Sequence, residues 1–195
     1  MVAERRDKAL RARPLDLWGI AFTGVLASGF VGGTTNVVNG LVSPQYFETV
    51  LGWGRRGIKD VWRASIAQGI YEGLLYGVAF SLIFTAATGI ITRSTCPYRF
   101  AMRHLLGILA GTYAAWALGG LAAIGLALLS PEFYQQHFFG VPREPVPMVR
   151  YAWVGGSIWG VELGGLVSVI LGLIVLRSNW FRTQEQDQLA YVSDL

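Results

Sequence analysis

The chain has 195 residues, of which 53% are hydrophobic and 14% are charged, and its mean hydropathy is +0.44. A soluble domain carries about 25% charged residues, so this chain has too few charges to cover a soluble surface of its size. The net charge of +4 does not indicate nucleic-acid binding, because the basic residues flank apolar blocks and do not alternate with aromatic residues on one face.

The N-terminal segment 1–14 is polar and basic, and we expect it in the cytoplasm. Four apolar blocks follow, each long enough to cross a hydrocarbon core of roughly 30 Å. The first block is too long for the core of a signal peptide, so we expect it to be retained. The sequence therefore predicts an all-α membrane protein with transmembrane helices over residues 15–42, 63–92, 104–129 and 151–176.

The distribution of Lys and Arg predicts the orientation of these helices, because both residues favour the cytoplasmic side. If the N-terminus is inside, the inner segments hold ten of the 16 Lys and Arg residues and the outer segments hold six. We therefore expect both termini in the cytoplasm, with a cytoplasmic loop over residues 93–103. The polar tail, residues 178–195, is expected to be a mobile cytoplasmic end.

Sequence features recur along the chain at an offset of 87 residues. The recurring residues are Gly24, Gly32-Gly33, Ser43-Pro44, Arg56, Arg63 and Ser81, matched by Gly111, Gly119-Gly120, Ser130-Pro131, Arg143, Arg150 and Ser168. A unit of two spans keeps its orientation when it is repeated. The offset therefore predicts two tandem parallel repeats, residues 15–92 and 104–177, related by an axis along the membrane normal.

Three glycines spaced four residues apart recur in the second and fourth spans. They are Gly69, Gly73 and Gly77 in the first repeat, and Gly156, Gly160 and Gly164 in the second. Glycines at this spacing share one helix face and let two backbones approach closely. We interpret them as contacts that hold the four helices together; contact with another subunit or with a ligand is an alternative.

Each Ser-Pro pair is followed by aromatic residues, which favours a short helix at the membrane surface. Serine suits the N-cap and proline the first turn of a helix, and aromatic side chains suit the headgroup boundary. The alternative is that Ser-Pro only ends the preceding span. The residues of these two interfacial segments are Ser43, Pro44, Tyr46 and Phe47, and then Ser130, Pro131, Phe133 and Tyr134.

Two carboxylates lie deep within the predicted spans, Glu72 in the second and Glu162 in the fourth. At about 1.5 Å per residue both lie near the middle of the membrane. Asn36, Asn39 and Gln68 can join Glu72 in a polar cluster in the outer half. These groups either satisfy one another through interhelical hydrogen bonds, or form a proton or cation path, or bind a polar substrate or lipid headgroup.

Enzyme motifs are absent from the sequence. The single cysteine, Cys96, excludes an internal disulfide and a cysteine-based metal cluster. The two histidines, His104 and His137, are predicted on opposite faces of the membrane and cannot share a metal. No HExxH, GxSxG or P-loop pattern occurs. We therefore expect neither enzymatic activity nor a cofactor or metal.

The segment from Asn36 to Phe47 resembles a group of bacterial integral membrane proteins. In that group an Asn or Asp ends a span before a Ser-Pro-Glu-Tyr-Phe element; here Asn36 and the residues from Ser43 to Phe47 match, with Gln45 in place of the Glu. The second copy keeps Glu132 but reverses the aromatic order and has Ala123 in place of the Asn. The group has no assigned activity, so the resemblance implies a multi-pass protein of the bacterial inner membrane and no catalytic residues.

Two functions remain open from the sequence. The first is a non-enzymatic accessory subunit of a membrane assembly, whose partners are the lipid bilayer and either further copies of the chain or other membrane subunits. The second is a small channel or transporter for a proton, cation or small solute that uses Glu72 and Glu162. The sequence gives no partner outside the membrane.

Overall fold

A computed structural model describes residues 14–193, and every regular element in that part of the chain is a helix. The helices are α2 (Pro14–Val42), α3 (Pro44–Val50), α4 (Val61–Ile91), α5 (Tyr98–Leu129), α6 (Pro131–His137) and α7 (Pro145–Ser193). Four of them, α2, α4, α5 and α7, are long and apolar enough to cross a membrane. The predicted all-α class with four spans is confirmed. Residues 1–13 of the predicted basic segment lie outside the described residues.

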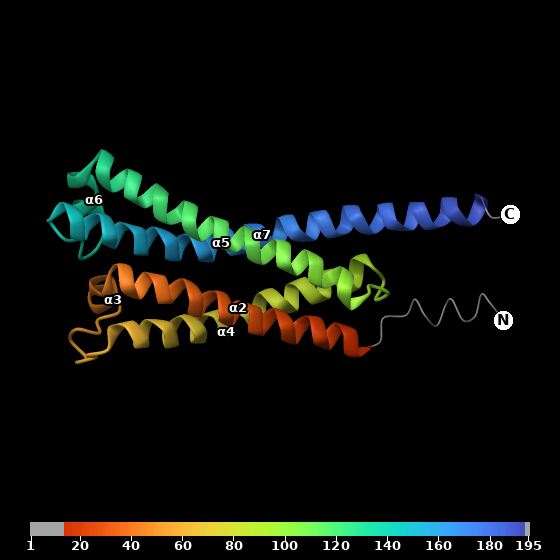
Figure 1. The fold of residues 1–195 in the computed structure, drawn as a ribbon, viewed down its shortest axis with the longest axis horizontal. Helices are drawn as coiled ribbons and strands as arrows, with labels where there is room; N and C mark the ends of the chain where they lie inside the picture. The colour runs from red at the N-terminus through yellow and green to blue at the C-terminus, as the bar shows by residue number, and fades with distance from the viewer. Residues whose placement is uncertain (1–13, 194–195) are drawn as a thin grey trace.

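The outer surface of the four long helices is apolar, as a lipid-facing surface requires. Trp18 on α2, Ile90 on α4 and Leu129 on α5 are each at least three-quarters exposed. The long helices run side by side, and α3 and α6 lie together at one end (Figure 1). The described chain begins and ends at the opposite end, so α2 starts on the side where α7 finishes.

The last helix is longer than predicted. It begins at Pro145 and continues to Ser193, whereas the sequence predicted a span ending at residue 176 and a mobile tail. The helix therefore ends later than predicted and includes the polar tail up to residue 193, and α7 projects beyond the other helices (Figure 1). The cause is local propensity: residues 184–190 are mainly Gln, Glu, Leu and Ala, which are strong helix formers, and the tail holds no Gly or Pro.

Glycines bring α2 and α4 into backbone contact. A Cβ atom added at Gly32 would collide with the carbonyl oxygen of Gly69, and one at Gly69 would collide with that of Gly32. A Cβ at Gly73 would lie 3.0 Å from the Cα of Gly29, and one at Gly77 would lie 2.7 Å from the Cβ of Ser28. Only glycine permits this crossing, because any side chain would push the two helices apart.

The same contacts recur between α5 and α7. Gly119 and Gly156 face each other as Gly32 and Gly69 do, and a Cβ at either would meet the partner's carbonyl oxygen. Gly160 and Gly164 lie against Ala115, which stands 87 residues after Ser28. All six predicted packing glycines therefore serve contacts within a helix pair.

The Ser-Pro segments do form short helices, with the serine at the N-cap and the proline in the first turn. Neither Ser43 nor Ser130 makes a side-chain capping hydrogen bond, contrary to the usual role of a serine cap. One aromatic residue of each helix, Phe47 in α3 and Tyr134 in α6, is buried against the spans. The buried residue of each helix cannot contact the membrane surface. In α6 the neighbouring Phe133 is 43% exposed and can do so.

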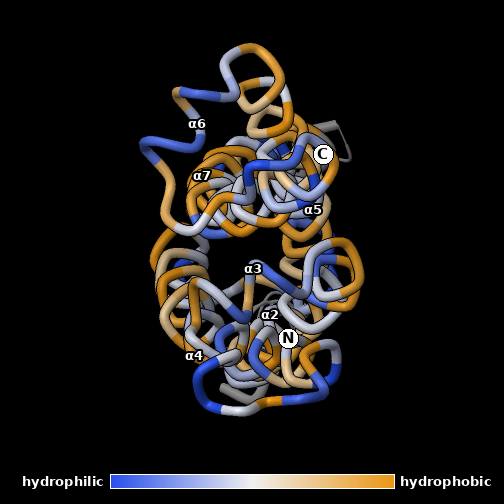
Figure 2. Tube along the Cα trace, turned by 90° about the vertical axis from the view of Figure 1, so that its left-hand side faces the viewer, coloured by the Kyte–Doolittle hydropathy of each residue, from blue (hydrophilic) through white to orange (hydrophobic). Residues whose placement is uncertain are grey.

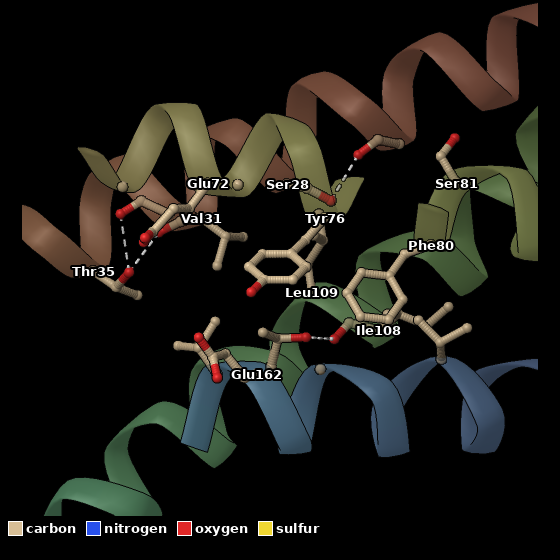
Figure 3. Close-up of a pocket in the computed structure, with 18 of the residues that line it drawn as sticks. Ser28, Val31, Thr35, Glu72, Tyr76, Phe80, Ser81, Ile108, Leu109 and Glu162 are labelled. Carbon is tan, nitrogen blue, oxygen red and sulfur yellow. Dashed lines mark hydrogen bonds between the residues drawn. The ribbon is translucent and has the colours of Figure 1, made fainter. Parts of the chain in front are cut away.

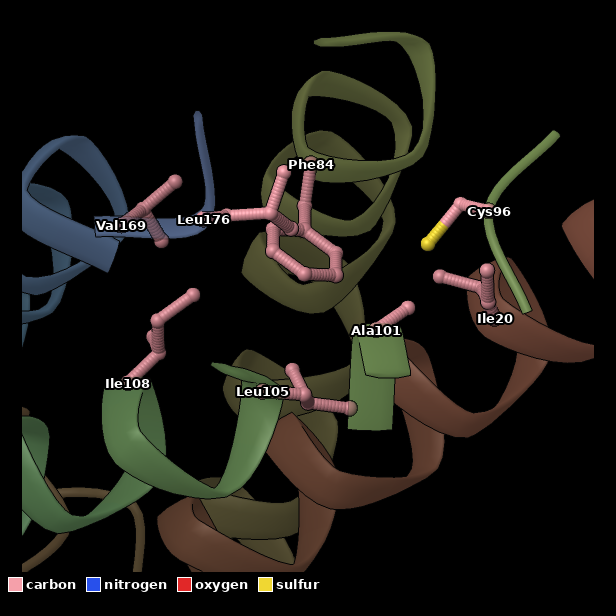
Figure 4. Packing of buried hydrophobic residues seen from close by; sticks show 8 residues of the cluster. All are labelled: Ile20, Phe84, Cys96, Ala101, Leu105, Ile108, Val169 and Leu176. Atoms are coloured by element: carbon pink, nitrogen blue, oxygen red, sulfur yellow. The ribbon is translucent and has the colours of Figure 1, made fainter. Parts of the chain in front are cut away.

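The two helix pairs lie against each other (Figure 2), with α2 and α4 in one half of the end-on view and α5 and α7 in the other. At the end near the chain termini, a cluster of buried apolar side chains from all four long helices and the α4–α5 loop joins the pairs (Figure 4). Its members are Ile20, Phe84, Cys96, Ala101, Leu105, Ile108, Val169 and Leu176. This cluster closes one end of the space between the pairs.

Candidate functional site

A cavity of about 190 Å³ lies between the two helix pairs and is lined by residues of all four long helices. The glycines of the crossings form part of its wall, including Gly32, Gly69 and Gly73, so backbone replaces side chains there. Both predicted intramembrane carboxylates line it, Glu72 from α4 and Glu162 from α7. In Figure 3 the two side chains point into this space from opposite sides.

A chain of buried hydrogen bonds joins three helices beside the cavity. The hydroxyl of Ser157 on α7 donates to Oδ1 of Asn39 at 3.0 Å, and Nδ2 of Asn39 donates to Oδ1 of Asn36 at 3.4 Å. Nδ2 of Asn36 then donates to the backbone oxygen of Ser65 on α4 at 3.1 Å. All four residues are buried. This chain satisfies the amides and ties α7 to the first helix pair.

Glu72 and Glu162 have different surroundings. Nε2 of Gln68, one turn away on α4, donates to Oε1 of Glu72 at 2.6 Å. No hydrogen bond from another described residue reaches the carboxylate of Glu162. No Lys, Arg or His lines the cavity, so neither carboxylate is neutralised by a basic residue of the wall. Burying a carboxylate in a membrane interior costs free energy unless a cation lies beside it or a proton neutralises it.

Three hydroxyl groups around the cavity donate their protons to backbone oxygens. Ser28 donates its proton to the oxygen of Gly24, Thr35 to that of Val31, and Thr112 to that of Ile108, at 2.9 to 3.0 Å. Each of these bonds stays within one helix, so each hydroxyl oxygen keeps its lone pairs for the cavity. The dashed lines of Figure 3 include such bonds. The polar lining therefore offers oxygen acceptors to a bound group.

The rest of the lining is aromatic and aliphatic. Tyr76, Phe80 and Phe84 follow one another along α4 toward the apolar cluster at the terminal end. Figure 3 shows the rings of Tyr76 and Phe80 extending into the space that Glu72 and Glu162 also face. Aromatic faces attract cations that have lost their water. The site thus combines negative charge with apolar surface.

Tyr46 connects α3 to this site. Its ring lies 5.0 Å from the ring of Tyr151 on α7 and touches the backbone face of Gly155. Burial raises the pKa of Tyr46 above its usual range, and the negative charges of Glu162 and Glu72 raise it further. Tyr46 also packs in the buried cluster that holds Val154 of α7, so α3 contacts a helix of the other pair.

The predicted polar cluster is brought together in large part. Asn36, Asn39 and Glu72 line the cavity. Gln68 is not part of the lining, but it donates a hydrogen bond to Glu72. Sequence reasoning missed Ser157, which completes the buried chain, because the residue 87 positions earlier is Ile70 and no polar pattern surrounds Ser157. It also missed the acceptor role of Thr35 and Thr112, for which a Ser or Thr facing its own helix is the only signal.

Within residues 14–193, no group of three His, Cys, Asp or Glu side chains could hold a metal ion. Comparison of the chain with protein-family models, curated proteins and solved structures finds no match. The resemblance of the segment from Asn36 to Phe47 to a bacterial membrane group stays a prediction. The functional argument therefore rests on the cavity.

Proposed function

We propose that this chain is a membrane carrier that binds a small organic cation in its central cavity, with Glu72 and Glu162 as the anionic groups. The observation that carries the proposal is two carboxylates facing one intramembrane cavity that no basic residue lines. A cation or a pair of protons satisfies them, whereas an anion would be repelled. Each bound cation would replace protons on these carboxylates, which couples its movement to that of protons.

The aromatic part of the lining favours an organic cation over a hydrated metal ion. Tyr76, Phe80 and Phe84 can contact the carbon atoms of a protonated or quaternary amine through their faces. These three side chains offer one oxygen, the phenol of Tyr76, so this stretch of the wall suits the carbon surface of an organic cation better than a hard metal cation, which prefers oxygen ligands all round. The chain of Asn36, Asn39 and Ser157 is then the structural support of the polar end of the cavity.

Uptake into liposomes tests this function. The purified chain, reconstituted in liposomes with a proton gradient, should take up radiolabelled tetraethylammonium with saturation, and Glu72→Gln with Glu162→Gln should lower the rate at least tenfold. Glu48→Gln is the matched control, because Glu48 is an exposed carboxylate on α3 outside the cavity. Equal uptake by the double variant and the control, or no uptake and no binding by the unaltered chain, would exclude the proposal.

A role as an accessory subunit is the second candidate. Glycines free to contact another subunit would have supported this role. All six packing glycines are occupied within the helix pairs, so they leave no groove for another subunit. What remains in its favour is the apolar exterior, which lipid also explains. Purification in a mild detergent distinguishes the two roles: a stable assembly with other membrane subunits supports the accessory role, and a transport-active single chain opposes it.

We further propose an internal repeat and an orientation in the membrane for this chain. The recurrence of the glycine crossings at an offset of 87 residues supports two tandem parallel repeats. The excess of Lys and Arg in the sequence segments predicted to be inside, ten against six, supports both termini in the cytoplasm, with α3 and α6 outside. The resemblance of the segment from Asn36 to Phe47 supports a bacterial inner membrane. Thiol labelling of single cysteines introduced at residues 48 and 185 in intact cells tests this orientation, and labelling of residue 185 from outside would overturn it.

A further inference from the structure

A second hollow of about 680 Å³ lies between α5 and α7, at the end where the described chain begins and ends. Its lining differs in charge from that of the central cavity, which contains two carboxylates. Two arginines, Arg103 on α5 and Arg182 on α7, line this hollow together with Asn179 and Thr183. No Asp or Glu is part of its lining. This groove is therefore positively charged at its polar end.

Neither arginine forms an ion pair with an acidic side chain that the structure describes. The ion pair found between residues 14 and 193 joins Arg63 to Asp60, at the other end of the molecule. Both Arg103 and Arg182 are exposed, so their guanidinium groups are available to a ligand. Two guanidinium groups at one mouth match the oxygens of a phosphate, which arginine binds through paired hydrogen bonds.

The polar wall of the groove is held in place by hydrogen bonds. Nδ1 of His104 lies 2.9 Å from the backbone oxygen of Phe100, so this nitrogen carries the proton and donates it. Nε2 of the same ring is then the acceptor for Nδ2 of Asn179 at 3.2 Å, a bond that joins α5 to α7. The amide of Asn179 keeps a second N–H for a ligand oxygen.

The inner part of the groove is mainly apolar and includes three glycines. Gly107 and Gly111 of α5 and Gly172 of α7 form its floor, and Leu171 and Val175 form its wall. A Cβ added at Gly107 would meet no atom within 4 Å. The groove therefore runs from two charged residues into open apolar surface along the membrane-spanning part of both helices.

We propose that this groove binds an anionic phospholipid. The phosphate lies between Arg103 and Arg182, and one acyl chain covers the glycine floor at Gly107. The continuity of charged mouth and apolar floor favours a lipid over a free phosphate ion, which would gain nothing from the glycines. Basic pockets between membrane helices on the cytoplasmic side are suited to anionic headgroups.

Native mass spectrometry of the full chain in detergent with added lipid tests the headgroup part. We expect the chain to retain phosphatidylglycerol at least tenfold better than phosphatidylcholine, and Arg103→Gln with Arg182→Gln to remove this preference. Arg99→Gln is the matched control, because Arg99 is exposed at the same end but lies outside the groove. Equal retention of phosphatidylglycerol by the double variant and the control would overturn the site.

The acyl part has its own pair of variants. Gly107→Leu adds a side chain at a floor position where a Cβ meets no protein atom within 4 Å, and it should lower phosphatidylglycerol retention several-fold, whereas Gly125→Leu should not. Gly125 also lies on α5 with no atom within 4 Å of an added Cβ, but outside the groove, so both variants should fold alike. An equal effect of the two variants would overturn acyl binding. Displacement of the lipid by inorganic phosphate at equal concentration would show a free-anion site and also overturn the proposal.

Discussion

In the first helix pair Gly32 lies against Gly69, and in the second pair Gly119 lies against Gly156 in the same way. The surroundings of these crossings differ. Beside the first, Asn36 of α2 and Ser65 of α4 exchange hydrogen bonds, with Nδ2 of Asn36 donating to Ser65 O and Ser65 Oγ donating to Asn36 O, both at 3.1 Å. The counterparts in the second pair are Ala123 and Ala152, which pack in an apolar cluster.

The comparison separates the residues that make a helix pair from those that make the cavity. The second pair closes with alanine at the positions of Asn36 and Ser65, so polar groups are not needed for the crossing. The first pair also carries Glu72, where the second has Trp159 with its ring largely outside. We therefore assign the polar residues of the first pair to the cavity between the pairs. The second pair contributes one carboxylate to this cavity, Glu162, at the position that corresponds to Leu75 in the first pair.

The largest effect should come from the crossings, which the two pairs share. Gly73→Ala places a Cβ 3.0 Å from the Cα of Gly29 and against the oxygen of Ser28, and Gly160→Ala places one 3.3 Å from the Cα of Gly119. Because the obstacles are backbone atoms, each change should cost roughly 1–3 kcal/mol of unfolding free energy. The double variant should lose the sum, since the sites lie in separate pairs.

Unfolding by sodium dodecyl sulfate, followed by circular dichroism, measures these losses, and Gly125→Ala is the control because its Cβ enters open space. A cost at Gly73 several times that at Gly160 would break the equivalence of the two crossings. A cost at both sites no larger than that of the control would show that backbone contact does not hold either pair.

A smaller loss of stability should appear at alkaline pH, because α3 and α6 bury different aromatic residues. The buried aromatic residue is Phe47 in α3 and Tyr134 in α6, and burial raises the pKa of Tyr134 to about 12. The folded phenol stays protonated while the unfolded one ionises near pH 10. Tyr134 therefore supports the fold fully below about pH 10, and this support falls as the pH rises to about 12, by at most about 3 kcal/mol.

Exchange of Phe133 and Tyr134, by Phe133→Tyr with Tyr134→Phe, tests this difference without changing the number of tyrosines. It gives α6 the aromatic order of α3 and moves the phenol to the more exposed position. The loss of stability between pH 10 and 12 should be smaller than in the unaltered chain. An unchanged alkaline slope would show that Tyr134 is not the group responsible.

The sequence was most informative where a residue type has one physical use. Glycines at a spacing of four and at a constant offset predicted the crossings, and Glu72 and Glu162 were recognised because carboxylates are rare in spans. The lengths of the apolar blocks also located all four spans, with the largest error at the end of α7. There the apolar signal stops, and helix propensity alone continues the helix to residue 193.

Contacts between the two pairs were beyond sequence reasoning. The meeting of Ser157 with Asn39 spans 118 positions and depends on how α7 lies against α2. Tyr46 reaching α7 from α3 depends on the direction of a seven-residue helix. Both follow from packing between the pairs, for which the chain carries no period and no repeated motif.

The smallest effect should come from making the first pair resemble the second. Asn36→Ala removes the bond to Ser65 O and the acceptor of Asn39 Nδ2, and Ser65→Ala removes the bond to Asn36 O; each should cost about 1 kcal/mol, as interhelical hydrogen bonds in membranes do. The double variant should cost less than the sum, because the two residues share their bonds. Additive losses in the same unfolding assay would contradict this coupling. Since Ala123 and Ala152 already pack well in the second pair, the double variant should keep its helix pair and change tetraethylammonium uptake more than stability.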